Sequence, residues 1–385
     1  MNLIFDDNDL HLSFAPLTLT RPVGDLRVGI KTIAESWADL LSEHFPIEAI
    51  EFKTEEYFED KFEPVEKRGL KIAGNIKPTP ALAKLLVGLK EGDDVYVNEK
   101  WVATMGITHS NRIEHQLPEE DLIYMTKPWH LFQNNGRCIR EDFIQITAGR
   151  TTRQLSASNQ VIGNGEIFLE EGAKVECCIL NTTNGPIYIG KEAEVMEGSV
   201  IRGPIALCEG AVIKMAAKIY GDTTIGPYCK VGGEVTNSIF QGYSNKGHDG
   251  FVGNSVIGEW CNIGADTNTS NLKNNYSNVR VFNYEFMEME DTDVQFCGVI
   301  MGDHCKTGIN TMLNTATSVG VCSNIFGGGF PPKFIPSFTW GVVSENENFK
   351  LNKALEVAEN MMKRRGVKLG KGDKRILEHL YEYLA

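Results

Sequence analysis

Between residues 189 and 231 an aliphatic side chain returns at every sixth position. Neither an α-helix, with its period of 3.6, nor a simple alternating strand, with its period of 2, requires a period of six. It fits a hexapeptide β-helix, in which each short strand sends one aliphatic side chain inward before the chain turns a corner. Glycine follows three of these positions, where it tolerates the unusual backbone angles of a corner. The eight aliphatic residues are Ile189, Val195, Ile201, Leu207, Ile213, Ile219, Ile225 and Val231, and the glycines are Gly190, Gly226 and Gly232.

The same spacing recurs on both sides of this run. It covers Val161 to Ile179, Phe251 to Thr269 and Met301 to Ile325, which gives 21 positions in total. Since three positions make one triangular coil, about seven coils are expected, stacked into a column roughly 34 Å tall. A β-sandwich does not hold one phase through eight consecutive hexads, so the pattern favours the β-helix.

Two further regions flank the repeat. Residues 1–135 mix strand and helix patterns, which predicts a compact α/β domain. We therefore expect three parts: an α/β domain over 1–135, a β-helix over 136–345 and a helical segment over 346–385. The terminal helices, over 346–362 and 374–384, could cap the open end of the column or lie along its side. In the first part, helices are predicted over 28–41, 80–89 and 129–150, and strands over 2–5, 94–98 and 101–104.

Composition agrees with an enzyme in the cytoplasm. The chain has 385 residues, 42% hydrophobic and 23% charged, and its formal net charge of −13 argues against a nucleic-acid partner. Its nine cysteines show no metal-ligand spacing, and we expect free thiols in a reducing compartment. No secretory segment or membrane-spanning apolar run is recognisable.

The candidate chemistry lies where the repeat is interrupted. Residues 241–250, QGYSNKGHDG, form the first interruption, and a polar excursion over about 270–294 forms the second. The first holds His248 between Gly247 and Asp249. An imidazole can take a proton near neutral pH, and glycine flanks give it access, so His248 is the candidate general base.

Residues 245–271, NKGHDGFVGNSVIGEWCNIGADTNTSN, carry a family resemblance. They resemble the acetyltransferase half of the bacterial bifunctional N-acetylglucosamine-1-phosphate uridyltransferase / glucosamine-1-phosphate N-acetyltransferase. The resemblance implies a left-handed parallel β-helix, a homotrimer with sites between subunits, and acetyl-CoA lying along the later coils. It implies that His248 is the general base and that Asn262 and Asn271 lie at the sugar site.

Several positions depart from that family. Phe251 stands where the family has a tyrosine, which removes a hydroxyl contact to the substrate, and Ile309 stands where a serine is expected near the acetyl group. The basic residues that hold the sugar phosphate have no clear equivalents, and Lys218 and Lys246 are the candidate replacements. The resemblance therefore implies the type of reaction, which is acetyl transfer from acetyl-CoA. An amino sugar 1-phosphate is the expected acceptor, although the residues that would bind it differ from those of the family.

The N-terminal part resembles the nucleotidyltransferase half of the same enzymes through residues 16–23, PLTLTRPV. That resemblance implies transfer from UTP or dTTP to a sugar 1-phosphate, with Thr18, Arg21 and Arg27 at the nucleotide and Asp6 and Asp7 as Mg²⁺ ligands. The glycine-rich loop that cradles phosphates in that family is replaced here by residues 7–13, DNDLHLS, which contain neither glycine nor arginine.

Three other functions stay open at this point. A zinc hydratase on the same kind of column would need three converging histidines, and the repeat region offers His248 and His304. A second alternative is a regulator that binds a sugar nucleotide without turning it over. A third is a nucleotidyltransferase whose column serves only for assembly.

Overall fold

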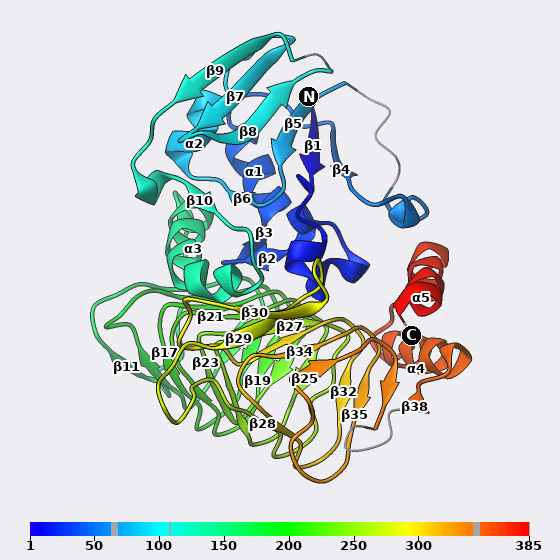
Figure 1. Cartoon of the computed structure of the whole chain (residues 1–385). Helices are drawn as coiled ribbons and strands as arrows, with labels where there is room; N and C mark the ends of the chain where they lie inside the picture. The colour runs from blue at the N-terminus through cyan, green and yellow to red at the C-terminus, as the bar shows by residue number, and fades with distance from the viewer. Residues whose placement is uncertain (63–67, 108, 342–346, 385) are drawn as a thin grey trace.

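The computed structural model describes residues 1–62, 68–107, 109–341 and 347–384. It confirms the predicted fold class: an N-terminal α/β domain stands on a parallel β-helix, and two helices follow at the C-terminal end (Figure 1). The N-terminal sheet has the strand order β4-β1-β5-β8-β7-β9. Its strands are β1 (Asn2–Asp6), β4 (Ala49–Lys53), β5 (Leu70–Ala73), β7 (Asp93–Val97), β8 (Lys100–Met105) and β9 (Asn111–His115). The helices of this part are α1 (Ile33–Ser42), α2 (Pro80–Leu85) and α3 (Trp129–Thr147), and β6 (Ile76–Lys77) pairs with β10 (Ile123–Tyr124).

The helix predicted over 28–41 begins five residues later, at Ile33. Residues before it form a small hairpin of β2 (Arg27–Val28) and β3 (Lys31–Thr32) around Gly29, whose φ is 78°. Thr32 and Glu35 then make a capping box, in which each side chain accepts a hydrogen bond from the other residue's backbone N–H. The prediction was wrong at this end because it followed apolar spacing alone, while glycine and the capping box fix the start of the helix.

The β-helix is a column with three faces. The first face is β11 (Gln160–Ile162), β14 (Ile179–Asn181), β17 (Val200–Arg202), β20 (Lys218–Ile219), β23 (Glu234–Thr236) and β26 (Phe251–Gly253). The second is β12 (Ile167–Leu169), β15 (Ile187–Ile189), β18 (Ile205–Leu207), β21 (Thr223–Ile225), β24 (Ile239–Gly242), β27 (Val256–Glu259), β31 (Val299–Met301), β34 (Thr317–Val319) and β36 (Phe334–Ile335). The third begins with β13 (Lys174–Val175), β16 (Glu194–Val195), β19 (Val212–Ile213), β22 (Lys230–Val231) and β25 (Asn245–Lys246), and later includes β32 (Lys306–Thr307), β35 (Asn324–Ile325), β37 (Thr339–Trp340) and β38 (Glu347–Asn348). A separate pair, β28 (Asn268–Thr269) with β33 (Met312–Leu313), continues the column.

The column is taller than the spacing predicted, because its longest face has nine strands where seven coils were expected. All eight residues of the hexad series are buried inside it. Two coils were not predicted. In the first, Val235, Phe240 and Lys246 point inward, but Phe240 follows Val235 after five residues instead of six, and a lysine takes the place of an aliphatic residue. The other contains Ile335, which is out of phase with the preceding repeat. A search for aliphatic residues at steps of six cannot find either coil.

Two excursions attach the column to the rest of the chain. The second interruption of the repeat forms a hairpin, β29 (Arg280–Asn283) with β30 (Glu288–Asp291), which reaches the N-terminal domain through a Lys127–Glu290 ion pair of 2.8 Å. The C-terminal helices, α4 (Leu351–Lys363) and α5 (Lys371–Leu384), lie beside the last coils (Figure 1). Both lie along the side of the column, and α5 packs back against residues 56–61 of the first domain. None of the helices formed by described residues is long and apolar enough to cross a membrane.

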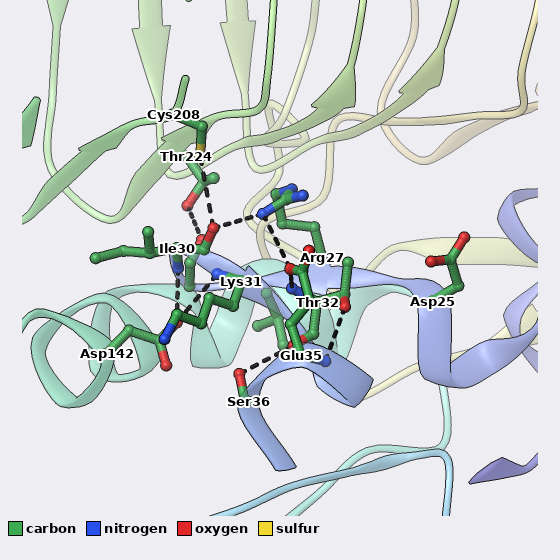
Figure 2. Close-up of polar contacts among 12 residues, drawn as sticks. Asp25, Arg27, Ile30, Lys31, Thr32, Glu35, Ser36, Asp142, Cys208 and Thr224 are labelled. Atoms are coloured by element: carbon green, nitrogen blue, oxygen red, sulfur yellow. Dashed lines mark hydrogen bonds and ion pairs between the residues drawn. The ribbon is translucent and has the colours of Figure 1, made fainter. Parts of the chain in front are cut away.

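The predicted domain boundary near residue 135 falls inside α3, and the first strand of the column, β11, begins at Gln160. Figure 2 shows how α3 and the β2–β3 hairpin meet the column. Asp142 of α3 accepts hydrogen bonds from the backbone N–H groups of Ile30 (2.7 Å) and Lys31 (3.2 Å) and from Lys77 Nζ (2.9 Å). From the column, the Thr224 hydroxyl donates to the Gly29 carbonyl at 2.8 Å. The hairpin is therefore fixed on both sides by buried polar contacts.

Asp142→Ala is expected to lower the free energy of unfolding by about 3–5 kcal/mol, because it leaves the buried Lys77 ammonium without its carboxylate. Urea denaturation followed by circular dichroism measures this. Asp39→Ala is the control, since its pair with Lys31 is half exposed and is expected to contribute less than about 1 kcal/mol. Equal losses in the two variants would contradict the role of Asp142.

Candidate active site around His248

A cavity of about 1000 Å³ lies between the third face of the column and helix α4. His248, exposed in the turn that follows β25, lines one side of it, and Asn262 from the next coil lies beside it. The two strand segments are held in register by a backbone bridge between Asn245 and Asn262. The structure therefore brings together two residues that the sequence proposed for one site. Among the described residues, none forms a hydrogen bond with the His248 imidazole, which leaves both ring nitrogens open to a substrate.

The cavity has a strongly basic wall, whose residues were not predicted from the sequence. Among the described residues, five cationic side chains line it and no carboxylate does. Within the described part of the chain, none of the five takes part in an ion pair. Burial lowers the pKa of Lys230, and the neighbouring cations, Arg365 first among them, lower it further. A site that gathers uncompensated positive charge in this way favours an anionic ligand. The five are Lys214, Lys230, Lys306, Arg364 and Arg365.

Apolar side chains also line the cavity. Ile309, which stands where a serine was expected, is 74% exposed and lines the cavity, as does Trp340. Helix α4 adds Val357 and Met361. The side chain of Arg365, at the end of α4, donates to Asn245 Oδ1 at 2.7 Å and so ties the helix to the column. The cavity can therefore contact both anionic and apolar groups of a ligand.

Three of the other predicted substrate residues lie outside this cavity. Phe251 and Asn271 meet beside Gly253 on the first face of the column, where Asn271 Nδ2 donates to Asn254 Oδ1 at 2.7 Å. Lys218, also on the first face, pairs with Glu234 at 3.2 Å. One chain by itself therefore does not bring these three side chains to His248.

Lys246, the fourth predicted substrate residue, points into the column instead of the cavity. It is only 1% exposed, and its Nζ donates to the backbone carbonyl of His248 at 2.8 Å. Its ammonium group is thus spent on an internal contact, which corrects the expectation that it faces the substrate.

The proposed nucleotide residues lie at the junction between the N-terminal domain and the column. Thr18 is fully buried, and its hydroxyl donates to the His11 carbonyl at 2.5 Å. Arg27 donates from Nε to the Gln241 carbonyl at 3.3 Å and from Nη1 to the Ile30 carbonyl at 2.5 Å. Arg21, 5% exposed, is bound by carboxylates of the column. All three side chains thus form contacts within the chain, and of the three Arg27 also lines an open pocket of about 610 Å³, between the β2–β3 hairpin and the column.

Asp6 and Asp7 do not fit a magnesium site as they stand. Asp7 accepts hydrogen bonds from the Val23 N–H (2.7 Å) and the Thr54 hydroxyl (2.5 Å). Asp6 accepts from the Asn8 N–H and from Lys53 Nζ, each at 2.9 Å. Both carboxylates are thus already used in the loop that follows β1. Within the described ranges, no three His, Cys, Asp or Glu side chains gather as a metal site would require.

Comparisons with known proteins found similarities to two different parts of the chain. A family model described as "Sugar nucleotidyl transferase" matches residues 2–151. Among curated proteins, no sequence matches the chain.

Solved acyltransferase structures resemble about half of the chain. The polySia specific acetyltransferase NeuO is 17% identical with a TM-score of 0.30, over 54% of this chain and 100% of that one. The Francisella novicida UDP-N-acetylglucosamine acyltransferase is 14% identical with a TM-score of 0.31, over 56% of this chain and 74% of that one. LpxA, a UDP-N-acetylglucosamine acyltransferase from Bacteroides fragilis, is 13% identical with a TM-score of 0.27, over 60% and 98%.

Proposed function

We propose that this protein transfers an acetyl group from acetyl-CoA to the amino group of a sugar phosphate, with His248 as the general base. The observation that carries the proposal is the cavity that His248 shares with five basic side chains, in which no carboxylate stands among the described lining residues. Such a wall suits phosphate groups, which both substrates carry. The apolar side chains of Ile309, Trp340 and Met361 suit the acyl-bearing arm of the thioester.

The chemistry explains why an imidazole is needed. A sugar amine is largely protonated at neutral pH and cannot attack a thioester in that form, so it must first lose one proton to solvent and attack as the neutral amine. When the amine nitrogen forms a bond to the thioester carbonyl carbon, a base must remove its extra proton, and His248 accepts it. The carbon–sulfur bond then breaks, and the proton passes to the departing thiolate. The cationic wall holds the phosphates and so fixes the amine and the thioester next to one another.

Two incubations test the proposal. Protein with acetyl-CoA and glucosamine 1-phosphate is expected to release free thiol, measured with a thiol-reactive dye. Protein with UTP or dTTP, Mg²⁺ and a sugar 1-phosphate measures pyrophosphate release. Thiol release that needs the amino sugar supports acyl transfer. If no thiol is released with this or other amino sugar phosphates, acyl transfer is the wrong assignment.

Nucleotidyl transfer by the N-terminal domain is the second candidate function, and the family model that matches residues 2–151 favours it. The internal contacts of Thr18 and Arg21 weigh against it, because these two buried side chains would have to leave the junction to reach a nucleotide. Pyrophosphate release in the second incubation would establish it.

We also propose that the chain assembles as a homotrimer through its column. Phe251 and Asn271 lie on a different face from the cavity, so they can contribute to a site with His248 when another subunit supplies them. Light scattering after gel filtration should then give about three times the 42.8 kDa of one chain.

Arg364→Ala is expected to raise the KM for the phosphate-bearing substrate about tenfold, since a hydrogen bond to a charged group contributes about 1.5–3 kcal/mol. Steady-state kinetics at low and moderate salt measures this, and the wild-type KM should rise with salt. Lys353→Ala is the matched control on the same helix, because Lys353 pairs with Glu356 on the exposed side of α4. If both variants raise KM equally, the effect belongs to general surface charge and the cavity assignment is wrong.

A further inference from the structure

Lys246 occupies an interior position that the repeat otherwise gives to an aliphatic side chain. It follows Asn245 in β25, and its Cα partner in the preceding coil is Val231, which pairs in turn with Ile213. Both of those residues are fully buried. A buried ammonium costs stability that an aliphatic side chain at the same position would not. Burial indeed lowers the pKa of Lys246 to about 8, against the opposing influence of Asp249 and Asp266. The cost indicates that this amine serves something other than packing.

The amine supports the turn that carries the candidate base. Its Nζ donates to the backbone carbonyl of His248 at 2.8 Å, from inside the column. Gly233, with φ of 70°, lies against the same turn. A Cβ at Gly233 would lie 2.8 Å from Lys246 Nζ and 2.8 Å from the carbonyl oxygens of both His248 and Gly250. Glycine is therefore required for the coil to approach the turn this closely.

Two backbone hydrogen bonds extend this support to the neighbouring coils. The Glu234 N–H donates to the Gly250 carbonyl at 3.1 Å, and the Asp266 N–H donates to the Asp249 carbonyl at 3.0 Å. The turn is thus held from both coils by its carbonyl groups, and the contact to the His248 carbonyl comes from the Lys246 side chain.

We propose that Lys246 is a positioning residue: its ammonium group, with Gly233 behind it, fixes the 247–250 turn so that the His248 imidazole faces the cavity. This inference rests on the proposed function of His248 as the base. It assigns Lys246 a role through His248 and not through contact with substrate.

Hydrogen exchange followed by mass spectrometry tests the support itself, without any substrate. In Lys246→Met the amides of Glu234 and Asp266 are expected to exchange at least about tenfold faster, because the turn that accepts their hydrogen bonds is released. Ile213→Met is the control, since it perturbs the same interior column two coils before Lys246. Unchanged exchange in Lys246→Met, or an equal acceleration in the control, overturns the proposal. Gly233→Ala provides a second variant that displaces the turn while keeping the lysine, and it is expected to accelerate the same amides.

Kinetics tests whether the support matters for turnover with acetyl-CoA and glucosamine 1-phosphate. Lys246→Met is expected to lower kcat by a factor of about 10 to 100 and to leave both KM values within about twofold, because displacement of the base slows proton removal without weakening binding. A substrate ligand would instead raise KM, and a purely structural lysine would lower the melting temperature and leave kcat unchanged. Either result overturns the positioning role. If the wild-type protein transfers no acyl group at all, the proposed function fails, while the exchange experiment still decides whether Lys246 holds the turn.

Discussion

His248→Ala is expected to lower kcat for acyl transfer by a factor of about 100 to 10,000, which is the contribution typical of a positioned general base. The side chain is exposed and forms no hydrogen bond with other described residues, so its removal leaves the packing of the column unchanged. KM for acetyl-CoA should stay within about twofold, because the basic wall of the cavity remains intact. Thiol release under saturating substrate measures kcat, and circular dichroism confirms the fold.

The matched control is His44→Ala, which removes an exposed imidazole from the N-terminal domain. It is expected to keep wild-type activity. His248→Gln adds a second comparison, since glutamine keeps polarity and approximate size but accepts no proton at neutral pH. Near-normal turnover in either His248 variant would show that another group removes the proton, and the assignment of the site would then have to change.

The β-helix was predictable because each of its coils meets the same physical requirement independently. Ile189 through Val231 repeat one aliphatic position eight times, so the pattern stays visible even where single residues vary. Val235, Phe240 and Lys246 form a coil that breaks both the spacing and the residue type, and the same turn region carries His248. The repeat is therefore hardest to recognise in the coil whose residues depart from the aliphatic pattern beside the candidate site.

The candidate site could be predicted only in part. His248 and Asn262 were found because they lie close together in sequence within a recognisable motif. Lys214, Lys230 and Arg364 were missed because they come from different coils and from the end of α4, and only folding brings them to one cavity. A signal existed, since Lys214 and Lys230 directly adjoin inward-facing residues of the repeat and so must point outward on one face.

The N-terminal segment shows how a sequence resemblance and a structure can point in different directions. Residues 16–23 resemble a nucleotide-binding segment, yet in this chain they pack against the column, where the Thr20 hydroxyl donates to Asp303 at 2.8 Å. The sequence cannot reveal that residues more than 280 positions further along the chain cover this segment. The junction between the N-terminal domain and the column is therefore the feature that is hardest to predict from local sequence patterns.

Arg21→Met is expected to lower the free energy of unfolding by about 3–5 kcal/mol, because it leaves the buried carboxylate of Asp303 without its cation. Arg21 Nη2 lies 2.5 Å from Asp303 Oδ2, and Nη1 lies 3.1 Å from Glu259 Oε1. Burial alone would lower the pKa of Arg21, but these carboxylates, Asp303 foremost, raise it well above its usual value. The guanidinium thus stays charged inside the junction. Urea denaturation followed by tryptophan fluorescence measures the loss.

Two further variants separate the junction from general charge effects. Arg21→Met combined with Asp303→Asn is expected to recover part of the loss, since it removes the unpaired carboxylate together with its partner. Arg112→Met is the surface control, because the Arg112–Glu114 pair is more than half exposed on both sides and is expected to contribute less than about 1 kcal/mol. If the single Arg21 variant is no less stable than this control, the contacts of Arg21 do not hold the two domains together, and the residue is free to serve a ligand as the resemblance to nucleotidyltransferases implies.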